Sequence, residues 1–246
     1  MMRLLLISST GRPYFEHCKE AVARFLGRNK TLGFVSAANL FDEKEYFRGM
    51  EERLIKTELA VARNMVHIRW DTSGLKMLDE VDGIFIGGGN TYTLLKRLKD
   101  SSLLKAIRER VQEGLPYIGS SAGANIAGPN ILTTNDWNVS GLTDFKSLNL
   151  VPFNLNPHYI ERSSTDAPYG ETKDDRIREY HQLWSNPVVA IEENALLEVE
   201  GDKAQVIGPG SIKLFEQHNT PRWYNAGENI EFGIGSSKSC EFIYSS

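Results

Sequence analysis

The chain has 246 residues, a formal net charge of −4 at pH 7, and a hydrophobic content of 41%. That length is enough to bury an ample core, in one large α/β domain or in two small ones. The mildly acidic balance provides no basic field, so we expect no nucleic-acid partner. The two cysteines, Cys18 and Cys240, lie far apart and outside any C-x-x-C motif. They predict neither a disulfide framework nor a zinc site, which favours a reducing compartment.

The apolar run at residues 4–7 is the first predicted element. It is too short for the h-region of a signal peptide, and Ser8, Ser9 and Thr10 follow it directly. We therefore interpret it as a buried strand. No apolar segment approaches the length of a membrane span. These features predict a cytoplasmic protein without a membrane partner.

Strand-like and helix-like segments alternate through the first half of the chain. Apolar segments predict strands at residues 3–8, 32–35, 65–70 and 83–86 and just before residue 119. Helical spacing predicts helices at residues 15–26, 43–63 and 103–112 and around residues 94–98. This alternation predicts an α/β fold in three layers, with a mostly parallel sheet and helices on both faces.

The second half of the chain is less regular. A polar loop at residues 163–173 leads to a predicted helix at 174–184, and strands are expected at 187–191, 195–199, 205–207 and 212–215. We find no internal repeat and no linker. The sequence therefore predicts a single α/β domain over residues 1–232, followed by a Gly/Ser-rich tail at residues 233–246.

The segment Gly119-Ser120-Ser121-Ala122-Gly123 fits the G-x-S-x-G pattern. A short apolar strand precedes it and a segment of small residues follows. This is the context of a nucleophile elbow, in which a serine sits on a tight strand-to-helix turn with its hydroxyl above the sheet edge. The following helix N-terminus adds free N–H groups where negative charge would develop. Ser121 is thus the candidate nucleophile.

A second glycine-rich turn, Gly87-Gly-Gly-Asn-Thr91, follows the strand predicted at residues 83–86. It lacks the lysine of a P-loop, so a nucleotide-binding loop is disfavoured. In open parallel sheets the active crevice lies beyond the carboxyl ends of the strands. We therefore expect both glycine-rich turns to face one crevice, although an ordinary strand-to-helix turn remains the alternative for residues 87–91.

A nucleophilic serine needs a base, and the chain contains five histidines. His158 follows Pro157 in a predicted loop, where a restricted backbone suits a base that must be held in place. From local sequence alone, a structural role for it is equally open. His17 is expected on a solvated helix face and His67 in a hydrogen-bonded position within a strand. His181 and His218 lack supporting context.

Several motifs in one order resemble the peptidase E family of α-aspartyl dipeptidases. They are Ile86-Gly-Gly-Gly-Asn-Thr91, Tyr117-Ile-Gly-Ser-Ser-Ala-Gly-Ala-Asn125, Thr133-Thr-Asn-Asp136, Asn156-Pro-His158, Gly170-Glu-Thr172 and Arg176-Ile-Arg178. The resemblance spans roughly residues 4–215. It implies a fold similar to class I glutamine amidotransferase domains, which is flavodoxin-like. It also implies hydrolysis of dipeptides with a free N-terminal aspartate, without any cofactor or metal.

The resemblance also implies roles for individual residues. Ser121 would be the nucleophile, His158 its base and Glu193 the acid of the triad, with the adjacent Glu192 as an alternative for the acid. The oxyanion hole would be formed by the N–H groups of Gly89 and Ala122. The implied substrate-binding residues are Asn90, Asp136, Lys173 and Arg176.

Within that set, Asp136 would bind the free amine of the substrate and Arg176 the aspartate side chain, because a guanidinium pairs well with a carboxylate. Lys173 and Arg176 are equally compatible with surface charges on a helix. Lys173 occupies a position where the family usually has arginine, and Ser120 one where tryptophan is frequent. These departures leave the chemistry intact but leave open a serine peptidase of wider acidic specificity, acting on β-aspartyl or cyanophycin-like substrates. A non-catalytic amidotransferase-like binding protein is a separate alternative, and the joint presence of Ser121, His158 and Glu193 argues against it.

Overall fold

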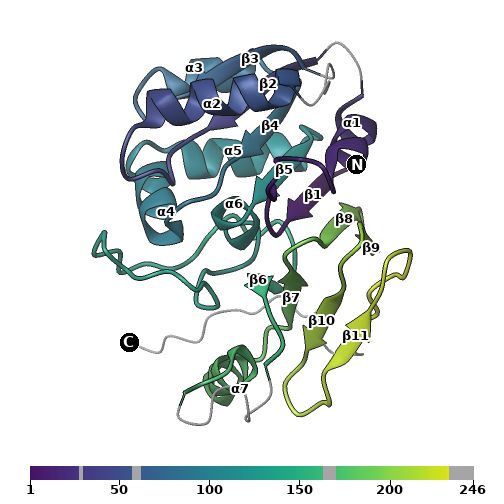
Figure 1. Cartoon of the computed structure of the whole chain (residues 1–246). Helices are drawn as coiled ribbons and strands as arrows, with labels where there is room; N and C mark the ends of the chain where they lie inside the picture. Colours follow the sequence, from purple (N-terminus) through teal and green to yellow (C-terminus); the bar gives the residue numbers. More distant parts are fainter. Residues whose placement is uncertain (28–29, 57–61, 163–169, 233–246) are drawn as a thin grey trace.

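The computed structural model describes residues 1–27, 30–56, 62–162 and 170–232. Within these residues a seven-stranded sheet forms the upper body in Figure 1. Its strands lie in the order β3 (Ala62–Ile68), β2 (Lys30–Val35), β4 (Gly83–Ile86), β5 (Tyr117–Ser120), β1 (Arg3–Ile7), β8 (Leu196–Glu200) and β9 (Lys203–Ile207). The first five strands are parallel, and β8 and β9 extend the sheet with antiparallel pairing.

Helices cover both faces of this sheet. The helices α1 (Lys19–Leu26) and α2 (Glu43–Lys56) pack on one face, and α3 (Gly74–Asp79), α4 (Thr91–Asp100), α5 (Leu103–Gln112) and the short α6 (Ala122–Asn125) pack on the other. The predicted three-layer α/β fold with a mostly parallel sheet is therefore confirmed.

The strand β1 shows how the sequence specifies these layers. Its residues Leu4, Leu5, Leu6 and Ile7 are all fully buried. Leu4 and Leu6 belong to the core under α3 to α6, whereas Leu5 and Ile7 belong to the core under α1 and α2. Since side chains alternate between the faces of a strand, a sheet covered on both sides needs a continuous apolar run.

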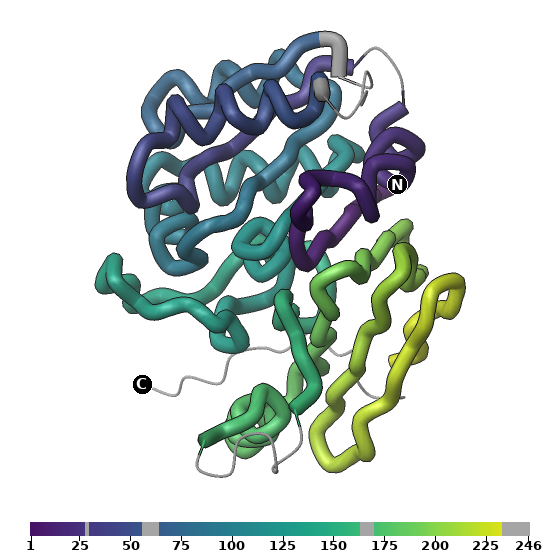
Figure 2. Tube along the Cα trace, in the orientation of Figure 1, coloured from purple at the N-terminus to yellow at the C-terminus, as the bar shows by residue number. Residues whose placement is uncertain are grey.

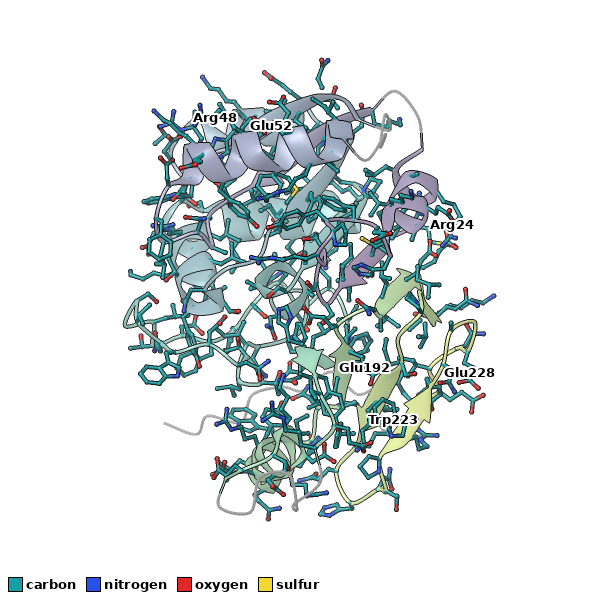
Figure 3. All side chains as sticks on the ribbon, viewed as in Figure 1. Arg24, Arg48, Glu52, Glu192, Trp223 and Glu228 are labelled. Atoms are coloured by element: carbon teal, nitrogen blue, oxygen red, sulfur yellow. The ribbon has the colours of Figure 1, made fainter. Side chains whose placement is uncertain are left out.

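The helix α2 shows the complementary pattern on the surface. Met50 and Leu54 are buried against the sheet. Arg48 and Glu52 are exposed and lie on the outer side of the helix (Figure 3). A polar outer face and an apolar inner face are the pattern of a helix that covers a sheet.

A second, four-stranded sheet completes the described part of the chain. Its order is β11 (Arg222–Tyr224), β10 (Ile212–Phe215), β7 (Val188–Glu192) and β6 (Asn154–Tyr159). The helix α7 (Lys173–Leu183) packs against it through Ile177 and Tyr180. A long loop at residues 126–153 connects α6 to β6 (Figure 2). The carboxyl end of β1 meets the β6–β7 pair, so the two sheets adjoin where the candidate catalytic residues lie.

Several predicted boundaries were wrong. The helix expected from residue 15 begins at Lys19, because Gly11 and Phe15 adopt positive φ values that an α-helix does not allow. The helix expected over residues 43–63 ends at Lys56, and the chain is already in β3 at Ala62, where pairing with β2 decides the conformation. The sequence analysis did not predict α3 or β11. The tail at residues 233–246 and most of the loop predicted at 163–173 lie outside the described residues.

A buried ammonium group ties the second sheet to α7. Lys213 on β10, with a side chain only 8% exposed, contacts Glu161 at 2.6 Å and Asp174 at 2.9 Å. Its Nζ atom also lies 3.2 Å from the Tyr159 hydroxyl, which donates to Asp174. Because Tyr159 directly follows the candidate base and Asp174 lies in the first turn of α7, this cluster connects β6, β10 and α7 next to His158.

Replacing Lys213 by methionine is expected to destabilise the protein. The change preserves the apolar stem but leaves the Asp174 carboxylate, whose side chain is 15% exposed, with only the more distant guanidinium of Arg178 at 3.7 Å. Lost hydrogen bonds to charged groups predict a decrease of about 2–3 kcal/mol in the free energy of unfolding. Urea denaturation measures the change, and Lys203→Met on the exposed edge strand β9 is the control. Equal stability of the two variants would contradict a structural role for the cluster.

Candidate functional site

Ser121 lies directly after β5, at the carboxyl edge of the large sheet. Its φ of 53° and ψ of −108° are strained for a residue with a side chain. The flanking glycines allow this turn. A Cβ atom on Gly119 would lie 2.4 Å from the Gly123 carbonyl oxygen, and one on Gly123 would lie 2.1 Å from the Ile86 carbonyl oxygen. The local geometry is therefore that of the predicted nucleophile elbow.

Two short hydrogen bonds connect Ser121, His158 and Glu193. The Oγ atom of Ser121 lies 2.7 Å from Nε2 of His158, and Nδ1 of the same ring lies 2.7 Å from Oε2 of Glu193. The structure thus brings together the three residues predicted as a triad. A hydroxyl, an imidazole and a carboxylate in this order can remove the hydroxyl proton and stabilise the resulting imidazolium.

The adjacent Glu192 has a different partner. Its carboxylate accepts a hydrogen bond from the Ser211 N–H at 2.8 Å, which joins β7 to the segment before β10. Figure 3 shows Glu192 on β7 in the second sheet. The geometry therefore favours Glu193 as the partner of His158.

The charge state of Glu193 is set by opposing effects. Partial burial, the largest of them, raises the pKa of this carboxyl group. The hydrogen bond and charge of His158, together with Ser9 and Lys173, outweigh burial and hold the pKa below its usual value. Glu193 is therefore ionised at neutral pH, as the partner of an imidazolium must be.

Lys173, at the first position of α7, lies next to the triad. Its ammonium group donates to the carbonyl oxygen of His158. Burial lowers the pKa of Lys173 to about 8, the nearby cations Arg162 and Arg176 act in the same direction, and the Glu193 carboxylate opposes them. Lys173 thus contacts the backbone of the candidate base, a contact that the sequence did not predict.

The two predicted oxyanion donors lie on either side of Ser121. Ala122 begins α6, so its N–H points out of the helix end. A Cβ atom on Gly88 would lie 3.1 Å from Cβ of Ser121, which places the triple-glycine turn against the nucleophile. The backbone of Gly88 bonds to the Tyr46 hydroxyl. The N–H groups of Gly89 and Ala122 have no acceptor within the described part of the chain.

Asn90 and Asp136 meet at the N-terminus of α4. The side chain of Asn90 caps this helix by accepting from the Thr93 N–H at 2.9 Å, and its amide nitrogen donates to the Trp137 carbonyl. One carboxylate oxygen of Asp136 accepts from the backbone and hydroxyl of Thr91 at 2.8 and 2.6 Å. The other has no partner among the residues described, so Asp136 retains one free acceptor beside the crevice.

One cavity borders Ser121 and His158, and a second, larger one is lined by neighbouring residues of β6 and α7. The first, of about 110 Å³, is lined by Ser121 and His158 together with Ser9, Thr10, Tyr46 and Gly88. The larger one, of about 420 Å³, is lined by Thr134, Asn135, Asn156, Lys173 and Arg176 and by apolar side chains of α7. Arg176 is 62% exposed and lies 3.6 Å from the Glu171 carboxylate. The predicted substrate-binding cations therefore border a common cavity beside the base.

The structure differs from the sequence-based expectation at two histidines and agrees with it at a third. His158 belongs to β6, not to a loop. The prediction of a solvated His17 was wrong, because the ring precedes α1 and is half-buried beside Ser9, and burial lowers its pKa. His67 is hydrogen-bonded as expected, with Nε2 at 2.7 Å from the Ser36 hydroxyl.

The sequence analysis missed Ser8, Ser9 and Tyr46 as neighbours of the triad. The available signal was the position of Ser8 and Ser9 at the end of a buried parallel strand, where an active crevice is expected. Tyr46 lies within a charged helix and gave no comparable signal.

The described residues contain neither a candidate metal site nor a membrane-spanning helix. No group of three or more His, Cys, Asp or Glu side chains is placed to hold a metal ion there. Nor does any helix in the described ranges combine the length and apolar character needed to cross a bilayer.

The chain is similar to known proteins over most of its length. Residues 4–207 match peptidase family S51. The chain is 38% identical to peptidase E of Streptomyces coelicolor over 93% of each chain. It is 40% identical to a Drosophila melanogaster protein named "Probable alpha-aspartyl dipeptidase", over 87% of this chain and 89% of that protein.

One solved structure supports the fold. The crystal structure of a peptidase from an acI-B1 Actinobacterium superposes with a TM-score of 0.72 at 18% identity, covering 94% of this chain and 97% of that chain. The family match and the two relatives cover most of the sequence, including both glycine-rich turns and His158. The chain therefore belongs to peptidase family S51, the family of peptidase E, and the expectation of a peptidase is confirmed.

Proposed function

We propose that this protein is a serine dipeptidase that hydrolyses dipeptides with a free N-terminal aspartate through Ser121, His158 and Glu193. The observation that carries the proposal is the continuous pair of 2.7 Å hydrogen bonds from the elbow serine through the imidazole to the carboxylate. The Drosophila relative, named as an alpha-aspartyl dipeptidase, supports the substrate class.

In the proposed reaction, Oγ of Ser121 attacks the carbonyl carbon of the scissile peptide bond while Nε2 of His158 takes the hydroxyl proton. Glu193 stabilises the imidazolium through Nδ1. The N–H groups of Gly89 and Ala122 bind the oxyanion of the tetrahedral intermediate. The C–N bond then breaks, and His158 returns its proton to the leaving amine.

The remaining aspartyl ester on Ser121 is hydrolysed by the same groups. His158 takes a proton from a water molecule, whose oxygen attacks the ester carbonyl. The second tetrahedral intermediate collapses, the Ser121 oxygen leaves and regains a proton from His158, and free aspartate is released. Two acyl-transfer steps therefore replace one difficult hydrolysis, and the reaction uses no cofactor.

Charge complementarity accounts for the proposed substrate. The free oxygen of Asp136 is available to the N-terminal ammonium group, which would exclude longer N-terminal extensions. Arg176, on the wall of the larger cavity, is the proposed partner of the aspartate side chain. Lys173 contributes positive charge at the same wall while its hydrogen bond holds the His158 backbone.

Replacing Ser121 by alanine is expected to abolish dipeptide hydrolysis and leave the protein folded, because the residue occupies a turn and not the core. Loss of a triad member lowers kcat by several orders of magnitude. Hydrolysis of Asp-Leu measures the effect. Ser73→Ala, which removes a partly exposed hydroxyl before α3, is the control. A folded Ser121 variant with normal turnover would refute the nucleophile assignment.

Asp-Leu is expected to be a better substrate than Asn-Leu, which is nearly isosteric but lacks the side-chain charge. A lost hydrogen bond between charged groups costs about 1.5–3 kcal/mol, which corresponds to roughly 10- to 100-fold in kcat/KM. Arg176→Met should remove most of this preference. Arg178→Met on the same helix, where the guanidinium contacts Asp175, should keep it. Equal kcat/KM for both dipeptides in the wild type would exclude the aspartyl specificity but not the triad.

The pH dependence of the reaction is expected to reflect the loss of the positive charge on Lys173. Its pKa of about 8 means that the ammonium charge beside His158 is present below pH 8 and is lost above it. Arginine at this position stays charged. The ratio of kcat/KM for Lys173→Arg to that for the wild type should therefore rise as the pH increases through about 8, and titration of the substrate amine cancels in this ratio. Lys203→Arg should give a flat ratio, and a flat ratio for Lys173→Arg would contradict the assignment.

A further inference from the structure

The strand β6 contains a break in its pairing at the candidate base. Asn156 pairs with Ala190 and Tyr159 pairs with Glu192, so the register shifts between these two pairs. His158 lies within the shift and has a φ of 57°. An extra residue in a strand is left out of the ladder of hydrogen bonds. The N–H of His158 and the carbonyl of Ile191 on β7 therefore need other partners.

One hydroxyl supplies both partners. The His158 N–H donates to Oγ of Ser8 at 2.7 Å, and the same Oγ donates to the Ile191 carbonyl at 3.1 Å. A serine hydroxyl has one donor and two acceptor sites, so it can replace a missing ladder bond on both strands. Ser8 is fully buried, which shields both bonds from exchange with solvent.

We propose that Ser8 is a positioning residue for His158, acting through the backbone without contact with the substrate. This inference rests on the proposed function, because it assumes that His158 is the catalytic base. The preceding residue makes a parallel contact, in which the Ile7 carbonyl accepts the Ser121 N–H at 3.0 Å. Consecutive residues of one strand end thus fix the backbones of the nucleophile and the base.

The consequence of losing Ser8 follows from this arrangement. Alanine would leave the His158 N–H and the Ile191 carbonyl buried without a partner, and the bulge would relax toward other geometries. The imidazole would then lose its fixed distance to Ser121. Substrate-binding groups on α4 and α7 do not contact Ser8 within the described structure, so the effect should fall on kcat.

The test compares Ser8→Ala with Ser147→Ala. Ser147 is a matched control because it is 1% exposed and its Oγ donates to the Gly128 carbonyl at 2.6 Å, away from the triad. Thermal unfolding verifies that each variant folds. Two readouts follow: kcat and KM for Asp-Leu, and the rate at which a small fluorophosphonate labels Ser121. Labelling needs the nucleophile and its base but no recognition of aspartate.

We expect Ser8→Ala to lower both kcat and the labelling rate by about 100-fold, since misplacement of a catalytic group by 1 Å has effects of this size. KM should change less than about twofold, as expected when only the transition state loses an interaction. Ser147→Ala should lower the unfolding temperature without changing either rate. Labelling of Ser8→Ala at the wild-type rate would overturn the inference.

The two proposals can fail separately. A wild-type protein that is labelled at Ser121 but does not cleave Asp-Leu would refute the aspartyl substrate, and labelling of Ser8→Ala would still decide the role of Ser8. If Ser8→Ala does not fold, Ser8→Cys replaces it, because a thiol keeps a weaker donor and acceptor at similar size. Labelling of the cysteine variant should be slower than that of the wild type, and equal rates would again overturn the inference.

Discussion

The carboxyl end of β1 is the constraint on which the candidate site depends. Three consecutive residues at this strand end each interact with a different member of the proposed triad. The Ile7 carbonyl accepts a hydrogen bond from the Ser121 N–H, and the Ser8 hydroxyl accepts one from the His158 N–H. A hydrogen bond from Ser9 helps to lower the pKa of Glu193. Leu4, Leu5 and Leu6 of β1 are fully buried between the two helical layers. One buried strand therefore positions residues that are distant in the sequence and belong to two different sheets.

Two residues of the proposed triad also have a strained backbone. Ser121 and His158 both adopt positive φ values, which cost about 1–3 kcal/mol each for residues with a side chain. Such conformations persist only where surrounding structure enforces them. Close packing around Gly119 and Gly123 enforces the first, and the Ser8 hydroxyl enforces the second. Both strained residues present their side chains to one another at 2.7 Å.

The sequence predicted the parts of this structure that are local. The apolar run of β1, the glycine-flanked Ser121 and the alternation of strands and helices each have a signature that neighbouring residues determine. The resemblance to a known family supplied Glu193, and it favoured a catalytic role for His158 where the local sequence left a structural role equally open. The bulge at His158 was not predicted, because pairing between β6 and β7 depends on residues that are 30 positions apart or more. The role of Ser8 was not predicted for the same reason, because its hydrogen-bond partners His158 and Ile191 are distant in the sequence.

The position of the cations on α7 has a consequence for how an acidic ligand approaches. The protein has a net charge of −4, which by itself would repel a dipeptide carrying two carboxylates. At physiological ionic strength the Debye length is about 8 Å, so most of that charge is screened from the crevice. Lys173 and Arg176, in contrast, line the larger cavity itself. Under the proposed function, selection of an anion would therefore depend on these two side chains at the start of α7 and not on the net charge of the protein.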